Sequence, residues 1–262
     1  MIVRYTLYFL FIITIIFLFI YIYNYIKENY KFLKANYYYE KEQLNYNKNI
    51  LAPNKTSLNY ININKVKKPL KCCILLTMYI GNDKYRKNMY ENIVDKWLKY
   101  TNFEIFSVDS SGKYLNNKSK RLYQYSFKQN KPFQNENPSV FEKDSILNIL
   151  KYYKHIFKKF DIIFKVTGKY FIKDLENIIP YIPNDADIIL QNQNNTHKQN
   201  SELVGIKTNI IEEILNLINN KKGFEEILFS TIIDNKYINY KLPPLKIKNN
   251  IKRGDNSILK YL

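Results

Sequence analysis

The segment around Gly168 carries residue types that suit a bound diphosphate. Lys165 and Thr167 alternate with apolar neighbours, so on an extended strand their side chains share one face. Gly168 then lets the backbone turn, and Lys169 follows it. Two ammonium groups and a hydroxyl beside such a turn favour phosphate oxygens. A plain turn with solvated lysines is the alternative, and the G-x-x-x-x-G-K-S/T pattern of a Walker loop is absent.

Two earlier strands also end in polar residues. Thr77 lies near the end of the apolar run 70–78, and Asp109 directly follows the run 103–108. An aspartate at the tip of a second parallel strand, beside the first strand-helix turn, can accept hydrogen bonds from a ribose or a base. An Asx-turn or a helix cap would explain Asp109 equally well.

One carboxylate pair has a spacing that suits a divalent cation. On an extended segment Asp185 and Asp187 would point to one side. They follow Pro183 and Asn184, however, and this composition favours a turn. We therefore predict no metal ligand here, and we expect lysines to balance a diphosphate charge.

The elements that must position these residues alternate between strands and helices. Ser139 and Glu142 match a capping box, which predicts the start of the best-supported helix. The alternation predicts one α/β domain over residues 69–262 with a mainly parallel sheet and ligands outside the carboxyl ends of its strands. The predicted strands are 70–78, 103–108, 160–166 and 188–190, and the predicted helices are 85–100, 121–127, 139–160, 172–179, 209–220 and 224–233, with Gly223 capping between the last two.

The amino end predicts a membrane anchor. Residues 5–23 contain no charge, proline or glycine, which is the length and character of a bilayer-spanning helix. A cleaved signal peptide is the alternative, but no small-x-small cleavage site follows. We expect a short tail at residues 1–4, a transmembrane anchor at 5–26 and a polar stem at 27–68. The lysines that follow the apolar run favour a cytoplasmic carboxyl side. Because the whole chain is basic, these lysines are weak evidence, and the orientation stays open.

Composition restricts the partners only weakly. The net charge is +18, but heavy use of Asn, Lys, Ile and Tyr points to an AT-rich coding genome rather than to a polyanion partner. The lysines are scattered, so nucleic-acid binding is a minor alternative. Cys72 and Cys73 are adjacent within an apolar run, and we expect them to be packing residues.

The order of these segments resembles a group of nucleotide-sugar glycosyltransferases with a GT-A-like fold, whose members share a strand ending in K-x-T-G-K/R-Y-F. The resemblance covers roughly residues 70–248. Many eukaryotic relatives carry one amino-terminal helix and a stem, which would make this a type II protein of the endoplasmic reticulum or Golgi. The segments that carry it are VDSSG, FEKDSILNILKYY, FDIIFKVTGKYF, DADIILQNQ, NSELVGIK and LPPLKIK.

The resemblance implies a role for each matching position. Glu202 would face the acceptor and could act as the general base of an inverting transfer, or it is a carboxylate on the rim. The sequence departs from the common GT-A pattern because no D-x-D follows the third strand, so a divalent metal is not favoured. The nucleoside would be held by Thr77 and Asp109, and the diphosphate or donor sugar by Lys165, Thr167, Gly168 and Lys169.

Two histidines complete the candidate residues. We expect His155 on the exposed side of its helix and His197 in a loop, where it could touch an acceptor hydroxyl. The leading hypothesis is a membrane-anchored glycosyltransferase with a nucleotide-sugar donor and a glycan or glycoconjugate acceptor. A non-catalytic carbohydrate-binding or scaffold protein on the same fold, and a basic nucleic-acid-binding protein, are its rivals.

Overall fold

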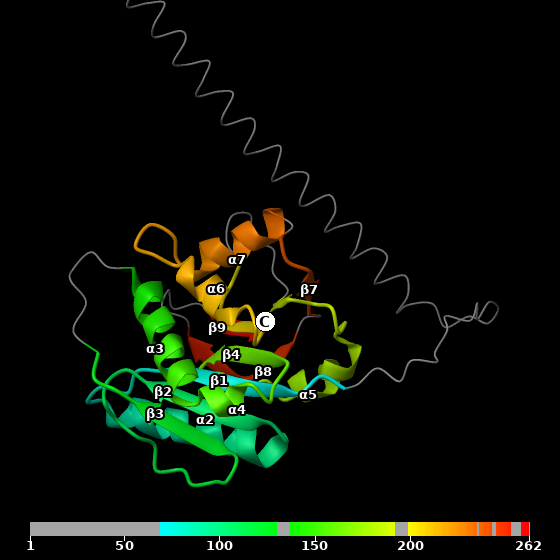
Figure 1. Cartoon of the computed structure of the whole chain (residues 1–262). Coiled ribbons are helices and arrows are strands. Elements are labelled where there is room, and N and C mark those ends of the chain that lie inside the picture. The colour runs from blue at the N-terminus through cyan, green and yellow to red at the C-terminus, as the bar shows by residue number, and fades with distance from the viewer. Residues whose placement is uncertain are drawn as a thin grey trace, which may run out of the picture. The chain divides into compact units, whose positions relative to one another are not determined.

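The computed structural model describes residues 69–129, 137–191, 199–234, 236–242, 245–252 and 258–261 (Figure 1). The predicted tail, anchor and stem lie outside these residues, as does His197. Among the helices that are described, none has both the length and the apolar character needed to cross a bilayer. The described residues belong to one compact unit, Lys65–Leu262.

The domain opens with the predicted strand-helix-strand unit. Strand β1 (Cys72–Met78) pairs in parallel with β2 (Glu104–Asp109), and helix α2 (Lys84–Tyr100) connects them. The helix begins where the Asp83 side chain accepts a hydrogen bond from the Arg86 amide. Because the strand side chains are nearly all buried, both faces of this part of the sheet are covered, as the continuous apolar runs predicted.

Seven strands form the central sheet, in the order β3-β2-β1-β4-β6-β5-β7. Strand β6 is antiparallel to both of its neighbours, whereas the other pairings are parallel. The predicted α/β class and mainly parallel sheet are therefore confirmed. The remaining strands are β3 (Leu122–Ser126), β4 (Ile162–Thr167), β5 (Ile188–Leu190), β6 (Leu203–Lys207) and β7 (Asn239–Lys241).

The expected short helix at 121–127 is wrong, because this segment is strand β3. Its tyrosines at positions 123 and 125 share one face, and Tyr123 stacks on Phe106 with ring centroids 4.7 Å apart. Strand β6 was not predicted at all. Neither was the separate antiparallel hairpin of β8 (Lys246–Lys252) and β9 (Ile258–Tyr261).

Helices cover both faces of the sheet and divide the core into two layers. Alternate residues of β1 show the division, because Ile74 and Leu76 pack toward α2 and Leu75 packs toward the opposite face. Figure 1 shows α3, α6 and α7 together above the sheet and α2 below it. The core layer that contains Leu75 also includes residues of α3 (Pro138–Tyr152), α4 (Lys154–Phe157), α6 (Ile211–Asn216) and α7 (Phe224–Ile233). Residues of α5 (Leu175–Ile178) and the 3-10 turn Ile179–Tyr181 belong to the layer of α2.

Helix α3 begins differently from the prediction. Asn137 is the N-cap, its side chain accepts from the Ser139 amide at 3.0 Å, and Pro138 occupies the first turn. The capping box at Ser139 is therefore wrong, which leaves Glu142 available for another contact. The predicted helix 139–160 is also interrupted at Tyr153, after which α4 carries the exposed His155.

Two smaller predictions concern Gly223 and the cysteines. Gly223 caps α7 at its start, where its amide donates to the Glu226 carboxylate at 2.8 Å. Neither Cys72 nor Cys73 forms a disulfide, and Cys73 is fully buried. Burial raises the pKa of the Cys72 thiol to about 12, with a smaller effect from the nearby Asp161. Both thiols are thus packing residues without nucleophilic thiolate at neutral pH.

Candidate functional site

The predicted site residues meet at the carboxyl edge of the parallel strands. Thr77 is in register with Thr167, and Met78 is in register with Asp109. Because β6 runs in the opposite direction, its first residues reach the same edge, and the Thr167 amide donates to the Glu202 carbonyl at 2.9 Å. The topology therefore gathers residues that are up to 125 positions apart in the numbering, from Thr77 to Glu202.

Gly168 forms the predicted turn, but its lack of a side chain serves close packing. Its amide donates to the Thr77 carbonyl at 2.9 Å. A Cβ at this position would lie 2.6 Å from Met78 Cγ and 2.9 Å from that carbonyl oxygen. The positive-φ glycines of the described residues are Gly81 and Gly112, so a left-handed backbone is not the reason for glycine at position 168.

Lys165 points into the domain rather than out of it. Its ammonium lies 2.7 Å from Glu142 Oε1 and donates to the Ser201 carbonyl at 2.6 Å, and only 2% of its side chain is exposed. The ring of Phe224 lies beside it, with the centroid 5.3 Å away. By contrast, the half-buried Lys169 follows the turn, 5.2 Å from the ring centroid of the next residue. The two predicted phosphate ligands thus have different surroundings.

Glu142 is a functional candidate that the sequence interpretation missed. Its carboxylate oxygen Oε1 accepts from the Thr77 hydroxyl at 2.8 Å as well as from the Lys165 ammonium. Helix α3 follows the strand β3, so its first turns lie at the carboxyl edge. The Asn-Pro pair at its start could have indicated in the sequence that Asn137 is the cap and that Glu142 has another role. The three side chains form one polar network between α3, β1 and β4.

Asp109 is buried and holds two loops together. Its Oδ2 accepts from the Ile80 amide at 2.7 Å. Its Oδ1 accepts from the Ser111 amide at 2.9 Å, the Ser111 hydroxyl at 2.6 Å and the Lys113 amide at 3.0 Å. These bonds match the Asx-turn alternative, and they position the β1–α2 turn and the loop after β2.

Glu202 has an orienting partner. Gln191, the first residue after β5, donates from Nε2 to Glu202 Oε2 at 3.2 Å, and its Oε1 accepts from the Leu203 amide at 2.8 Å. Gln199 fixes Gln191 in turn, by donating to its carbonyl at 2.9 Å. Gln191 is almost fully buried, whereas Glu202 is only partly buried. A partly accessible carboxylate in a set orientation can accept a hydrogen bond or a proton from a hydroxyl.

The corner around Lys165 holds more carboxylates than cations. Glu225 adds a third carboxylate to Glu142 and Glu202 and accepts from the Ser201 hydroxyl at 2.6 Å. Carboxylates accept hydrogen bonds from hydroxyl groups, whereas they repel phosphate oxygens. This corner therefore suits a sugar better than a diphosphate.

Asp185 and Asp187 lie at the opposite, amino edge of the sheet, directly before β5. The predicted turn is present, because the Ala186 amide donates to the Pro183 carbonyl at 3.1 Å. Asp187 accepts from Lys207 Nζ at 2.9 Å and from the Ile238 amide at 3.0 Å. Burial opposes its ionisation, but these donors outweigh burial and hold the Asp187 pKa below its ordinary value.

A cation site elsewhere in the described chain would need a cluster of metal-ligating side chains. No group of three or more His, Cys, Asp or Glu side chains within the described ranges could hold a metal ion. The pair at positions 185 and 187 is separated by the sheet from the carboxyl edge.

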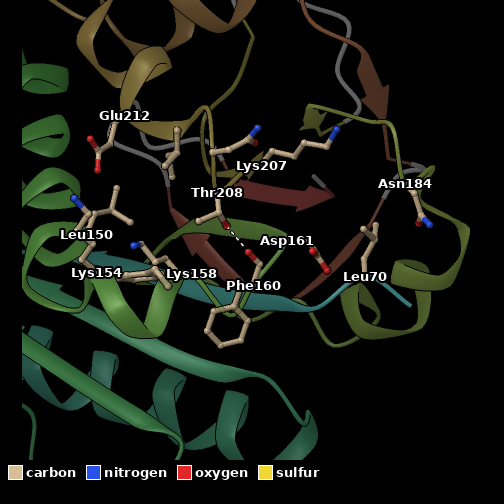
Figure 2. Close-up of a pocket in the computed structure, with 13 residues that line it drawn as sticks. Leu70, Leu150, Lys154, Lys158, Phe160, Asp161, Asn184, Lys207, Thr208 and Glu212 are labelled. Carbon is tan, nitrogen blue, oxygen red and sulfur yellow. Dashed lines mark hydrogen bonds between the residues drawn. The ribbon is translucent and has the colours of Figure 1, made fainter. Parts of the chain in front are cut away.

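The two described cavities also lie away from the carboxyl edge. One, of about 600 Å³, opens beside the amino ends of β1 and β4 (Figure 2), and another, of about 320 Å³, lies along α2. Neither is lined by the predicted site residues. At the carboxyl edge the chain leaves the described residues after Gln129 and after Gln191.

Comparison with known proteins gives distant similarities of fold. No family model matches the chain, and no curated protein matches it. A mannosyltransferase from Pyrobaculum calidifontis, in complex with GDP-Man and Mn2+, is 11% identical with a TM-score of 0.45. The match covers 72% of this chain and 59% of the mannosyltransferase chain. This chain therefore matches less than two thirds of that enzyme.

Two other solved structures are similar at the same level. A cytidylyltransferase from Leptospira borgpetersenii is 12% identical with a TM-score of 0.43, covering 66% of this chain and 76% of its own. A glycosyltransferase involved in the glycosylation of the major capsid of PBCV-1 is 10% identical with a TM-score of 0.41, and the match covers 66% of this chain and 81% of that enzyme. Similarities this distant carry no argument about the reaction of this chain.

Proposed function

We propose that this chain is a glycosyltransferase that moves a sugar from a nucleotide-diphosphate donor to a glycan or glycoconjugate. One observation carries the proposal: the Glu202 carboxylate, oriented by Gln191, lies beside the ends of parallel strands. In an inverting transfer Glu202 takes the proton of the acceptor hydroxyl while the oxygen of that hydroxyl attacks the anomeric carbon. The bond to the diphosphate breaks, and its electron pair leaves with the diphosphate.

The nucleoside belongs at the turn after β1. Tyr79 is 55% exposed there, and its ring lies close to Gly81, whose φ is +60°. An exposed ring offers a flat face to a base. In this proposal Asp109 acts as a positioning residue, because its hydrogen bonds hold the loops on either side of that ring.

The diphosphate belongs at the turn formed by Gly168 and Lys169. This revises the sequence interpretation, since the Lys165 ammonium is engaged by Glu142 and Ser201. Lys165 instead holds Glu142 and Thr77 in place for sugar hydroxyls, while Lys169 supplies the charge for the phosphate oxygens. The predicted anchor at residues 5–26 is kept as part of the proposal, because it would hold the enzyme beside a membrane-bound acceptor.

The test measures donor hydrolysis and transfer by the full chain with a panel of uridine- and guanosine-diphosphate sugars. Glu202→Gln should lower kcat by roughly 100-fold or more, because it removes the base, while donor affinity stays within about twofold. Lys169→Met should weaken donor binding by about tenfold, because it removes a charge-assisted bond. Glu213→Gln, an exposed carboxylate on α6, is the control and should change neither quantity.

Chelation separates two ways of balancing the diphosphate charge, namely lysine side chains and a bound divalent cation. EDTA should change transfer little, since the Asp185 and Asp187 pair lies at the other edge of the sheet. Full activity in Glu202→Gln would refute the assignment of the base. Glycan binding without any donor hydrolysis would instead favour the carbohydrate-binding rival.

A further inference from the structure

The cavity of about 600 Å³ is separate from the proposed transfer site. It lies at the amino edge of the sheet, between α3 and α4 on one side and the segment from β6 into α6 on the other (Figure 2). Its volume falls within the range of roughly 300–1,000 Å³ that ligand sites occupy. The proposed function does not use it, because Thr77, Thr167 and Glu202 lie at the opposite ends of these strands.

The deep part of the cavity is apolar. Leu150 from α3, Phe157 from α4 and Ile211 from α6 line it and are almost fully buried. Leu70, which precedes β1, and Phe160, which precedes β4, are half-buried at its side. A ligand must therefore place carbon and hydrogen atoms against this floor to gain from burial.

The rim carries both hydrogen-bond donors and acceptors. The exposed Lys154 and Lys158 lie one helical turn apart on one side, and the exposed Glu212 comes from α6 on the other. Figure 2 shows Lys207 and Asn184 farther along the rim from Glu212. Amide, ammonium and carboxylate groups thus surround an apolar floor.

The charges of the rim balance, and this decides the ligand class. The lysines at positions 154, 158 and 207 are matched by Asp161, Glu212 and the Asp187 that pairs with Lys207. A phosphate or an anionic lipid head would gain little net attraction and would meet two carboxylates. A purely apolar ligand would cover the charged rim without hydrogen bonds. A neutral ligand with one apolar face and several hydroxyls satisfies both floor and rim.

We propose that this cavity is a carbohydrate-binding site for a neutral pyranose, distinct from the transfer site. The C–H face of the sugar ring lies on Leu150 and Ile211. Its hydroxyls accept hydrogen bonds from Lys154 and Lys158 and donate to Glu212. Such a site would hold a glycan at a distance from the place where a sugar is transferred, so it adds binding strength by a second attachment.

The experiment is a saturation-transfer NMR titration of the full chain in phosphatidylcholine nanodiscs, with empty nanodiscs as background. The probes are the methyl glycosides of glucose, mannose and galactose, and octyl phosphate is the anionic probe. At least one glycoside should bind saturably, and Lys158→Ala should weaken it at least about fivefold by removing a charged hydrogen-bond donor. Lys159→Ala is the matched control, because Lys159 is an exposed neighbour that does not line the cavity.

Two further variants identify the site and the ligand class. Glu202→Gln, at the other edge of the sheet, should leave the binding of the glycoside unchanged. Glu212→Lys should abolish glycoside binding and create binding of octyl phosphate, because it makes the rim positive. The proposal is overturned if no glycoside binds, if Lys158→Ala and Lys159→Ala behave alike, if binding is lost in Glu202→Gln, or if octyl phosphate binds the unaltered chain in preference to every glycoside.

Discussion

The ion pair between Lys165 and Glu142 predicts an asymmetric effect on stability. The lysine side chain is 2% exposed and the glutamate side chain 24% exposed. Glu142→Gln keeps an oxygen for Thr77 and Lys165 but removes the negative charge that contacts the buried ammonium. Removing one partner of a buried pair costs roughly 3–5 kcal/mol. We expect about 3 kcal/mol of lost unfolding free energy, because the Ser201 carbonyl still accepts from the ammonium.

Removing the lysine instead of the glutamate should lower the unfolding free energy by less. In Lys165→Met the glutamate can reach water and keeps the hydrogen bond from Thr77, while methionine fills the volume of the lysine stem. We expect a loss of about 1 kcal/mol, the size of one net hydrogen bond. The double variant should lie within about 1 kcal/mol of Lys165→Met, because no uncompensated charge remains.

Urea unfolding of residues 69–262 measures this cycle through the fluorescence of Trp97, the single and fully buried tryptophan. Glu213→Gln breaks the exposed pair with Lys236 and should leave the urea midpoint unchanged. The reasoning is refuted if Lys165→Met costs as much as Glu142→Gln, or if the two losses add in the double variant. Either result would mean that the ammonium is not held by the glutamate.

Four other predictions follow from the same geometry. Gly168→Ala should lower the unfolding free energy by about 1–3 kcal/mol in a urea titration, because its Cβ would press on the Thr77 carbonyl. Asp187→Asn should destabilise the domain at neutral pH. Because folding lowers the Asp187 pKa, the contribution is present above the unfolded value near 3.8 and is lost as pH falls through the folded pKa, so the two unfolding curves should converge in acid. Asp109→Ala should speed hydrogen exchange at the three amides that its carboxylate binds, and unchanged exchange would contradict its role as a clamp. If residues 5–26 span a bilayer, the full chain should stay with membranes after a carbonate wash, and its release would refute the anchor.

The sequence predicted most reliably those strands that are buried on both faces. The run ending at Met78 and the run 188–190 are apolar throughout, and the structure has β1 and β5 there. Strand β3 was mistaken for a helix because it is a half-buried edge strand whose tyrosines pack on α3. Strand β6 was missed because its five residues contain Gly205, which is needed where Phe164 of β4 approaches closely. Local propensity does not record such tertiary contacts.

The edge of the sheet that carries the candidate site could be predicted, whereas the partners of its side chains could not. Parallel strands bring Thr77 and Thr167 to one edge whatever their side chains do. Gln191 and Glu202 meet only because β6 reverses direction between β4 and β5. No spacing within either segment contains that information.

Lys165 shows how this limit affects a functional assignment. A lysine at the end of a strand has the same appearance in a sequence whether it faces solvent, a phosphate or a carboxylate. The difference is set by α3, which begins at Pro138 and brings Glu142 over the strand. Once the pair forms, the buried ammonium is bound by the Ser201 carbonyl and by a glutamate that also binds Thr77. For this reason the proposal assigns the charge for a donor to the turn that follows β4, where Lys169 lies.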